Sequence, residues 1–190
     1  VSVAARLLPA VIGCYSTFCC INSAKPHNGG GVYSGSSAVL FGRFFVLQAM
    51  RTPKEILQES RVIAVVGLSD QAWRDSYRIA AYMKLQGYTI YPVNPTIESA
   101  LGIPSYPDIQ SIPEQVDIVN VFRNPRYLMR VVDDAIAAGA HTIWFQLGVV
   151  NPEAERRAAE AGLEVISDRC IAVDYRMYGL QDTKGLRESK

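Results

Sequence analysis

The sequence predicts an α/β domain built as a three-layer sandwich with a mainly parallel five-stranded sheet. Five short runs of apolar and β-branched residues recur along the chain, each closed by a glycine, a proline or a polar turn. Segments with the apolar spacing of a helix separate most of these runs. Strands that alternate with helices form parallel sheets with right-handed crossovers, so we expect a Rossmann-like architecture.

The first 49 residues differ from the rest of the chain in charge and composition. They contain Arg6, Lys25 and Arg43 but neither Asp nor Glu, so all 18 acidic residues lie after Met50. Three interpretations stay open: a targeting segment, a disordered extension around the glycine-rich stretch 27–37, or a start site assigned too early. We favour Met50 as the true initiator, and we expect a chain that begins there to fold and to bind like the full sequence.

The overall charge and composition argue against several classes of partner. A net charge of +1 indicates no general attraction to nucleic acid or to an anionic membrane. No apolar run approaches the roughly 20 residues that a membrane-spanning helix needs. Residues 50–190 contain a single cysteine, Cys170, so no disulfide framework is expected, and the composition is typical of a cytoplasmic domain.

A helix-start signal follows Met50 directly. Thr52 is a favoured N-cap residue, Pro53 suits the first helical position, and Glu55 completes a capping box. The stretch "RVIAVVGL" at 61–68 comes next, and its β-branched residues closed by a glycine predict a strand buried on both faces. The folded part of the chain is therefore expected to begin at about residue 50.

A second helix and strand follow. Asp75 or Ser76 is expected to cap the helix, which ends near Gly87. The stretch "YTIYPVNP" at 88–95 then predicts the second strand of the sheet. The proline-rich stretch 102–115 is expected to hold short elements at most.

The second half of the chain repeats the alternation. The expected elements are a strand at 116–122, a helix with its apolar face over 128–136, a strand at 141–148, a helix capped by Asn151 and ended by Gly162, and a strand at 163–170. The tail after Gly179 is polar and is expected to fray. We place the domain at 50–180 and the polar tail at 181–190.

The carboxyl ends of the strands are the expected ligand-binding edge. In open parallel sheets, ligands bind outside these ends, where the strand order changes direction. The segments that follow the five predicted strands are 67–71, 93–95, 122–124, 146–148 and 168–170.

The turn after the first strand favours an anion. Gly67 leads into a helix, whose first backbone N–H groups and positive dipole end attract phosphate. Ser69 and Ser76 offer hydroxyl donors, and Arg78 and Arg123 offer positive charge. A lone glycine after a buried strand also occurs as a simple tight turn, so this signal is weak by itself.

NAD and ATP do not fit the turn well. Ser69 and Ala72 stand where the dinucleotide fingerprint has its second and third glycines. The second strand ends in Val93-Asn94-Pro95, whereas NAD folds place an acidic residue there for the ribose hydroxyls. A G-K-[ST] sequence, which a P-loop requires, does not occur.

The sequence resembles the small stand-alone CoA-binding proteins, whose fold is similar to the CoA-binding domain of the succinyl-CoA synthetase α subunit. The resemblance extends over about 52–178. It rests on the order and spacing of "VVGLS" (65–69), "SYRIAAYM" (76–83), "GYTIYPVNP" (87–95), "VDIVNVFR" (116–123), "WFQLGVVN" (144–151) and "SDRCI" (167–171).

The resemblance implies coenzyme A as the cofactor and a site built by three segments. It implies that the CoA phosphates lie on the opening turn, the adenosine beside the end of the second strand, and the pantetheine arm past the third and fourth strand ends. The implied residues are Gly67, Ser69 and Ser76 for the phosphates, Val93, Asn94 and Pro95 for the adenosine, and Phe122, Arg123 and Gln146 for the arm. To this cofactor-binding set we add Arg78, for the positive charge named above.

We therefore expect a single non-catalytic module that binds CoA or a short acyl-CoA. Two alternatives stay open: a nicotinamide-nucleotide-dependent enzyme, and a protein–protein adaptor that kept the fold without a ligand. No catalytic constellation emerges from the sequence. His141 is placed at the opposite end of the sheet, Asp168 is expected to pair with Arg169, and Cys170 is expected to be a buried, inert thiol.

Overall fold

The computed structural model describes residues 50–183. Expectations for residues 1–49, and for the polar tail from residue 184 onward, lie outside this range. The elements are α1 (Pro53–Glu59), β1 (Val62–Val66), α2 (Asp75–Leu85), β2 (Thr89–Val93), β3 (Ser99–Ala100), β4 (Ile103–Pro104), β5 (Ile118–Val121), η1 (Pro125–Tyr127), α3 (Leu128–Ala137), β6 (Thr142–Phe145), α4 (Pro152–Glu160), β7 (Glu164–Ile166), α5 (Ile171–Met177) and η2 (Leu180–Thr183).

Within residues 50–183 the main sheet has five strands in the order β2-β1-β5-β6-β7. All four pairs of neighbours are parallel, as the alternation of strands and helices predicts. The chain moves from β1 to β2 on one side and then returns to place β5 on the other side of β1. The switch point therefore lies at the carboxyl ends of β1 and β5.

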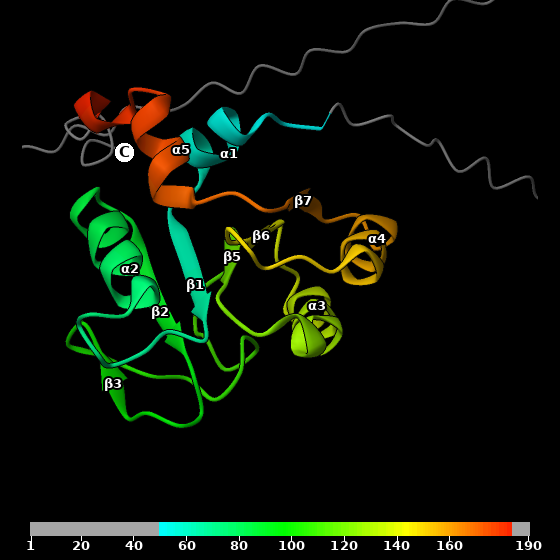
Figure 1. The fold of residues 1–190 in the computed structure, drawn as a ribbon, viewed down its shortest axis with the longest axis horizontal. Helices are drawn as coiled ribbons and strands as arrows, with labels where there is room; N and C mark the ends of the chain where they lie inside the picture. Colours follow the sequence, from blue (N-terminus) through cyan, green and yellow to red (C-terminus); the bar gives the residue numbers. More distant parts are fainter. Residues whose placement is uncertain (1–49, 184–190) are drawn as a thin grey trace, which may run out of the picture. The chain divides into compact units, whose positions relative to one another are not determined.

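Helices cover both faces of the sheet, which confirms the three-layer prediction (Figure 1). Among the described residues, the buried side chains form two clusters. Ala64 and Val66 of β1 belong to the cluster under α3 and α4, whereas Ile63 and Val65 belong to the cluster under α1, α2 and α5. Alternate residues of a strand point to opposite faces, so an apolar run such as β1 fills both cores.

The segment before β1 begins with a capped helix and with an ion pair to β7. Thr52 and Glu55 form the predicted capping box at the start of α1. Just before it, the guanidinium Nη2 of Arg51 lies 2.7 Å from the Oε2 of Glu164 on β7. Arg51 and the capped helix α1 thus contribute to the fold of the described residues.

The Arg51–Glu164 pair predicts acid-sensitive stability. Burial raises the pKa of Glu164, but hydrogen bonds from Arg51 and Thr142 outweigh it and hold this pKa below its ordinary value. A carboxylate with a depressed native pKa contributes stability above its unfolded pKa of about 4.3 and loses it as pH falls through the native pKa. We expect Glu164→Gln to lower the free energy of unfolding near neutral pH. We also expect the free energy of unfolding of this variant to fall less steeply as the pH is lowered.

Urea unfolding of the variant between about pH 3 and 7 measures this contribution. Glu160→Gln is the matched control, because Glu160 is exposed and pairs with Arg156 at 3.6 Å on the surface of α4. Equal pH profiles for the two variants would contradict the prediction.

Three local expectations are wrong. The N-cap of α2 is Arg74, without a side-chain cap, because the Ser76 hydroxyl instead accepts a hydrogen bond from the backbone of Ser69. Helix α5 follows β7 at a place where the sequence pattern predicts no helix. The tail does not fray directly after Gly179, because Leu180 is buried and begins η2.

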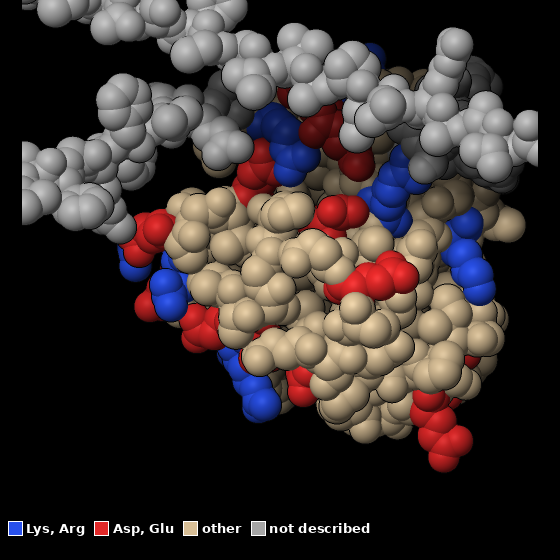
Figure 2. Space-filling model, turned by 180° about the vertical axis from the view of Figure 1, so that it is seen from behind, with Lys and Arg blue, Asp and Glu red and all other residues tan. Residues whose placement is uncertain are grey.

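In the described part of the chain, no helix has both the length and the apolar character that crossing a bilayer requires. On the face in Figure 2, the basic and acidic side chains of the described residues are interspersed rather than gathered by sign.

Candidate functional site

Gly67 sits at the switch point and is fixed by both neighbouring strands. Its backbone N–H donates to the Val93 carbonyl of β2 at 2.9 Å, and the Phe122 N–H after β5 donates to the Val66 carbonyl at 2.9 Å. The φ angle of Gly67 is +84°, and a Cβ there would lie 3.0 Å from the Phe122 carbonyl oxygen. Glycine is therefore required both by the backbone conformation and by the close approach of the loop after β5.

Two serines hold the turn after Gly67 in shape. The Ser69 N–H donates to the Ser76 Oγ at 3.2 Å, and the Gln71 N–H donates to the Ser69 Oγ at 3.1 Å. These bonds use the hydroxyl oxygens as acceptors and leave each hydroxyl proton able to donate. The predicted phosphate-binding turn is thus an ordered loop that leads into α2.

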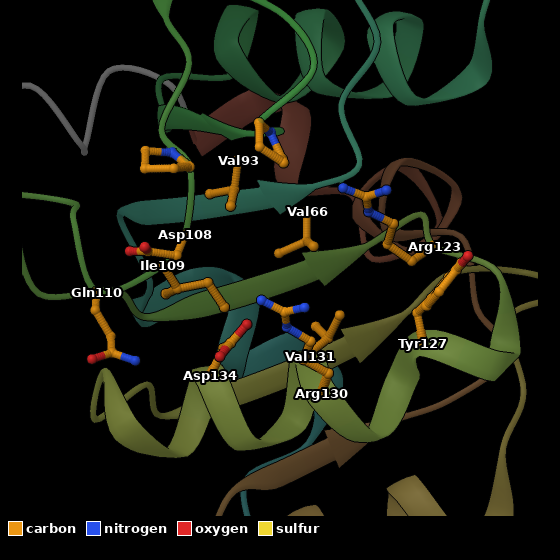
Figure 3. Close-up of a pocket in the computed structure, with 12 residues that line it drawn as sticks. Val66, Val93, Asp108, Ile109, Gln110, Arg123, Tyr127, Arg130, Val131 and Asp134 are labelled. Atoms are coloured by element: carbon orange, nitrogen blue, oxygen red, sulfur yellow. The ribbon is translucent and has the colours of Figure 1, made fainter.

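A cavity of about 580 Å³ opens beside this turn at the carboxyl edge of the sheet (Figure 3). Its volume lies within the range of small-molecule sites. It is bounded by the ends of β1 and β2, the loop after β4, the loop after β5, and helix α3. The lining residues are Val66, Val93, Pro95, Pro107, Asp108, Ile109, Gln110, Arg123, Tyr127, Arg130, Val131 and Asp134.

Val93, Pro95 and Arg123 are the expected cofactor residues that line the cavity. Gly67 adjoins it, because Val66 lies in the wall and a Cβ on Gly67 would lie 3.3 Å from the Arg123 Cδ. The structure thus brings together, from distant segments, some of the residues that were expected to contact the phosphates, the adenosine and the pantetheine arm.

Other expected residues have structural contacts outside the cavity wall. Gln146 is buried, and its Nε2 donates to the Asn120 Oδ1 at 2.8 Å. The Asn94 Nδ2 donates to the Leu68 carbonyl at 2.8 Å, so this side chain braces the turn after β1. Phe122 packs on the core cluster of α1, α2 and α5, and Arg78 is exposed, 3.9 Å from Asp75.

Two parts of the cavity wall are not among the residues that the sequence predicts. The loop 107–110 reaches the cavity because Tyr106 bridges to Val93 beside the main sheet. Arg130 and Asp134 reach it from α3, one helical turn apart. Their i, i+4 spacing next to the apolar face is the signal in the sequence that could have indicated them.

The cavity combines apolar walls with positive charge that has no partner in the protein. Within residues 50–183, neither Arg123 nor Arg130 forms an ion pair or a hydrogen bond through its guanidinium. The carboxylate of Asp108, in contrast, accepts from the Ser111 N–H at 2.8 Å and from its Oγ at 2.7 Å. The arrangement suits a ligand that carries both an anionic and an apolar part.

The strands and helices that build the cavity match a known protein family. A model described as a CoA binding domain matches residues 61–176, which span β1 to α5 and include the whole cavity wall. The chain belongs to this CoA-binding domain family.

The CoA-binding domain is similar to nearly the whole of one small protein and to a part of a larger one. It is 46% identical over 120 residues to the protein YneT of Bacillus subtilis (strain 168), a match that covers 63% of this chain and 89% of YneT. It is 25% identical over 127 residues to the ADP-forming acetate–CoA ligase I of Archaeoglobus fulgidus, covering 60% of this chain but 18% of the ligase.

A solved structure has the same architecture as this CoA-binding domain. A hypothetical protein from Pyrococcus horikoshii OT3 is 36% identical, with a TM-score of 0.65, and the match covers 67% of this chain and 92% of that protein. The Rossmann-like fold that the strand pattern predicts is therefore confirmed.

Two charged residues that follow β7 in the CoA-binding domain, Asp168 and Arg169, have structural partners. The expected Asp168–Arg169 pair is wrong: Arg169 instead lies 2.7 Å from the buried Asp174 of α5, and this hydrogen bond raises its pKa. Asp168, which has a positive φ of 54°, accepts a hydrogen bond from the Gly148 N–H at 2.8 Å, just after β6. Cys170 is half-buried at the start of α5 and packs on the adjoining core.

Proposed function

We propose that this domain binds coenzyme A, or a short acyl-CoA, as a single non-catalytic module. The observation that carries the proposal is the cavity beside the Gly67 turn, whose wall includes the unpaired guanidinium groups of Arg123 and Arg130. CoA joins a diphosphate to an adenine ring and to a pantetheine arm that carries methyl and methylene groups between its amides, so both the cations and the apolar wall suit it. Membership of the CoA-binding domain family supports this choice.

The diphosphate is assigned to the turn after β1. The first turn of α2 offers its backbone N–H groups and its positive dipole end to an anion, and the turn at Gly67 leads into it. Arg123 adjoins Gly67 and supplies a charge-assisted partner. Ser76 is buried beneath the turn and supports it through Ser69, and Arg78 adds positive charge on the exposed side of α2.

The adenosine and the pantetheine arm are assigned to the two sides of this turn. Val93 and Pro95 offer an apolar surface to the adenine at the end of β2, with Asn94 bracing the loop behind them. The arm is assigned to the path past Phe122 and toward the end of β6, where Gln146 lies. In this arrangement the ligand crosses the switch point, as in other open parallel sheets.

A ligand screen by thermal unfolding tests the proposal. We expect CoA and acetyl-CoA to stabilise the domain and NAD, NADP and ATP to leave it unchanged. A ligand that binds only the native state at 100 times its dissociation constant adds about 2.7 kcal/mol. A melting shift with NAD and none with CoA would favour the nicotinamide-dependent alternative, and no shift with any nucleotide would favour the adaptor.

A further inference from the structure

Arg130 is a cation of the cavity wall that the placement of the diphosphate does not use. It projects from α3, whereas Arg123 comes from the loop after β5 (Figure 3). Other arginines near α3 are paired: Arg157 of α4 lies 3.3 Å from Asp133, and Arg126 stacks on the Tyr127 ring at 4.6 Å. Among residues 50–183, no ion pair or hydrogen bond is formed by the Arg130 guanidinium.

The position of Arg130 is fixed by its helix, although the side chain itself is exposed. Leu128, Val132 and Ala135 of α3 are fully buried in the core and anchor the helix against the sheet. Asp134 follows Arg130 by one turn, but the order base-then-acid is the weaker one in a helix, and the two groups do not pair. The packed helix thus places Arg130 at the cavity wall, and its unpartnered guanidinium is suited to a phosphate, which an arginine binds in bidentate geometry.

Coenzyme A carries a second phosphate besides its diphosphate. The 3'-phosphate of its ribose is a monoester with nearly two negative charges at neutral pH. The ribose joins the adenine, assigned to Val93 and Pro95, to the diphosphate, assigned to the Gly67 turn. Its 3'-phosphate is attached next to these two assigned parts, and among the described residues the cavity wall holds one further unpaired cation besides Arg123, namely Arg130.

We infer that Arg130 binds the 3'-phosphate of CoA and makes the domain selective for CoA over nucleotides that lack this group. The inference rests on the proposed function, because it assigns one more part of the same ligand. The inference can be measured separately from the proposed function. Arg123 is assigned to the diphosphate, which many nucleotides share, whereas Arg130 is assigned to the 3'-phosphate, which dephospho-CoA does not have.

Calorimetric titration of CoA and dephospho-CoA into the full chain tests the inference. We expect the wild type to bind CoA about tenfold or more tightly than dephospho-CoA, as one charge-assisted contact provides. In Arg130→Gln, the dissociation constant for CoA should rise to that of dephospho-CoA, whose own value stays unchanged. Arg156→Gln is the matched control, since Arg156 is paired with Glu160 outside the cavity, and it should keep the wild-type ratio.

The outcomes separate this inference from the proposed function. Equal affinity of the wild type for CoA and dephospho-CoA would overturn the role of Arg130 and leave CoA binding intact. A parallel loss of both affinities in Arg130→Gln would also overturn it, because the arginine would then act on a part that both ligands share. Failure of the wild type to bind either ligand would overturn both proposals.

Discussion

Substitution of Gly67 by valine is expected to remove CoA binding while the domain still folds. The Cβ of any side chain at this position would lie 3.0 Å from the Phe122 carbonyl oxygen, a backbone atom that cannot move independently. Valine is also strained at a φ of +84°, with a cost of about 1–3 kcal/mol. The turn must shift to accommodate it, and the N–H groups assigned to the diphosphate then lose their alignment. We expect the affinity to fall by about a hundredfold or more, as loss of two such hydrogen bonds implies.

Gly162→Val separates the effect on the ligand from backbone strain. Gly162 has a similar φ of +90°, but a Cβ at this position would meet no other atom within 4 Å. It precedes β7, at the amino end of the sheet and away from the proposed site. Both variants are compared by urea unfolding and by titration with CoA. Wild-type affinity in a folded Gly67→Val variant would mean that the phosphates bind elsewhere.

Replacement of Tyr175 by alanine is expected to cause the largest loss of stability. This side chain of α5 is fully buried, and its ring contacts Tyr82 and Tyr88 edge-to-face at centroid distances of 6.2 and 5.9 Å. Its hydroxyl donates to the Leu180 carbonyl at 2.7 Å, which ties η2 to the core. Removal of a buried aromatic side chain costs about 3–5 kcal/mol, and the unsatisfied carbonyl adds to this loss.

Val173→Ala on the same helix is the control for Tyr175→Ala. Val173 is 42% exposed, so its truncation is expected to change the free energy of unfolding by no more than about 0.5 kcal/mol. Tyr175→Phe isolates the hydroxyl and is expected to cost about 1 kcal/mol. Urea unfolding at neutral pH ranks the three variants. A cost below about 1 kcal/mol for Tyr175→Ala would show that α5 does not stabilise the core in solution.

Local signals in the sequence predict most of the elements that these variants probe, and α5 is the exception. The strands of the main sheet, the capping box at Thr52 and the glycine at the end of β1 all appear where the pattern places them. Helix α5 escapes prediction because it is seven residues long and follows β7 without a capping signal: Cys170 is its N-cap and makes no side-chain cap bond. Short helices of this kind are stabilised by tertiary packing rather than by local propensity.

The proposed site can be predicted only in part, for the same kind of reason. Strand ends can be read from the sequence, and they indicate Gly67, Val93, Pro95 and Arg123. The sequence does not show that Gln146 is buried against Asn120, because that contact joins side chains of two neighbouring strands. Position along a strand assigns a residue to the ligand side, whereas the actual direction of its side chain depends on what it packs against.

The class of fold, the edge of the sheet where a ligand is expected and the place of the turn at Gly67 all follow from the amino-acid sequence. Periodicity, caps and turn residues are properties of contiguous segments, so they can be read without coordinates. Three features come from the three-dimensional fold instead: the strand order β2-β1-β5-β6-β7, the place of the loop 107–110 beside β2, and the position of Arg130 in the cavity wall. Those features arise from contacts between segments far apart in the chain, and an apolar pattern shows that a face is buried but not which face covers it.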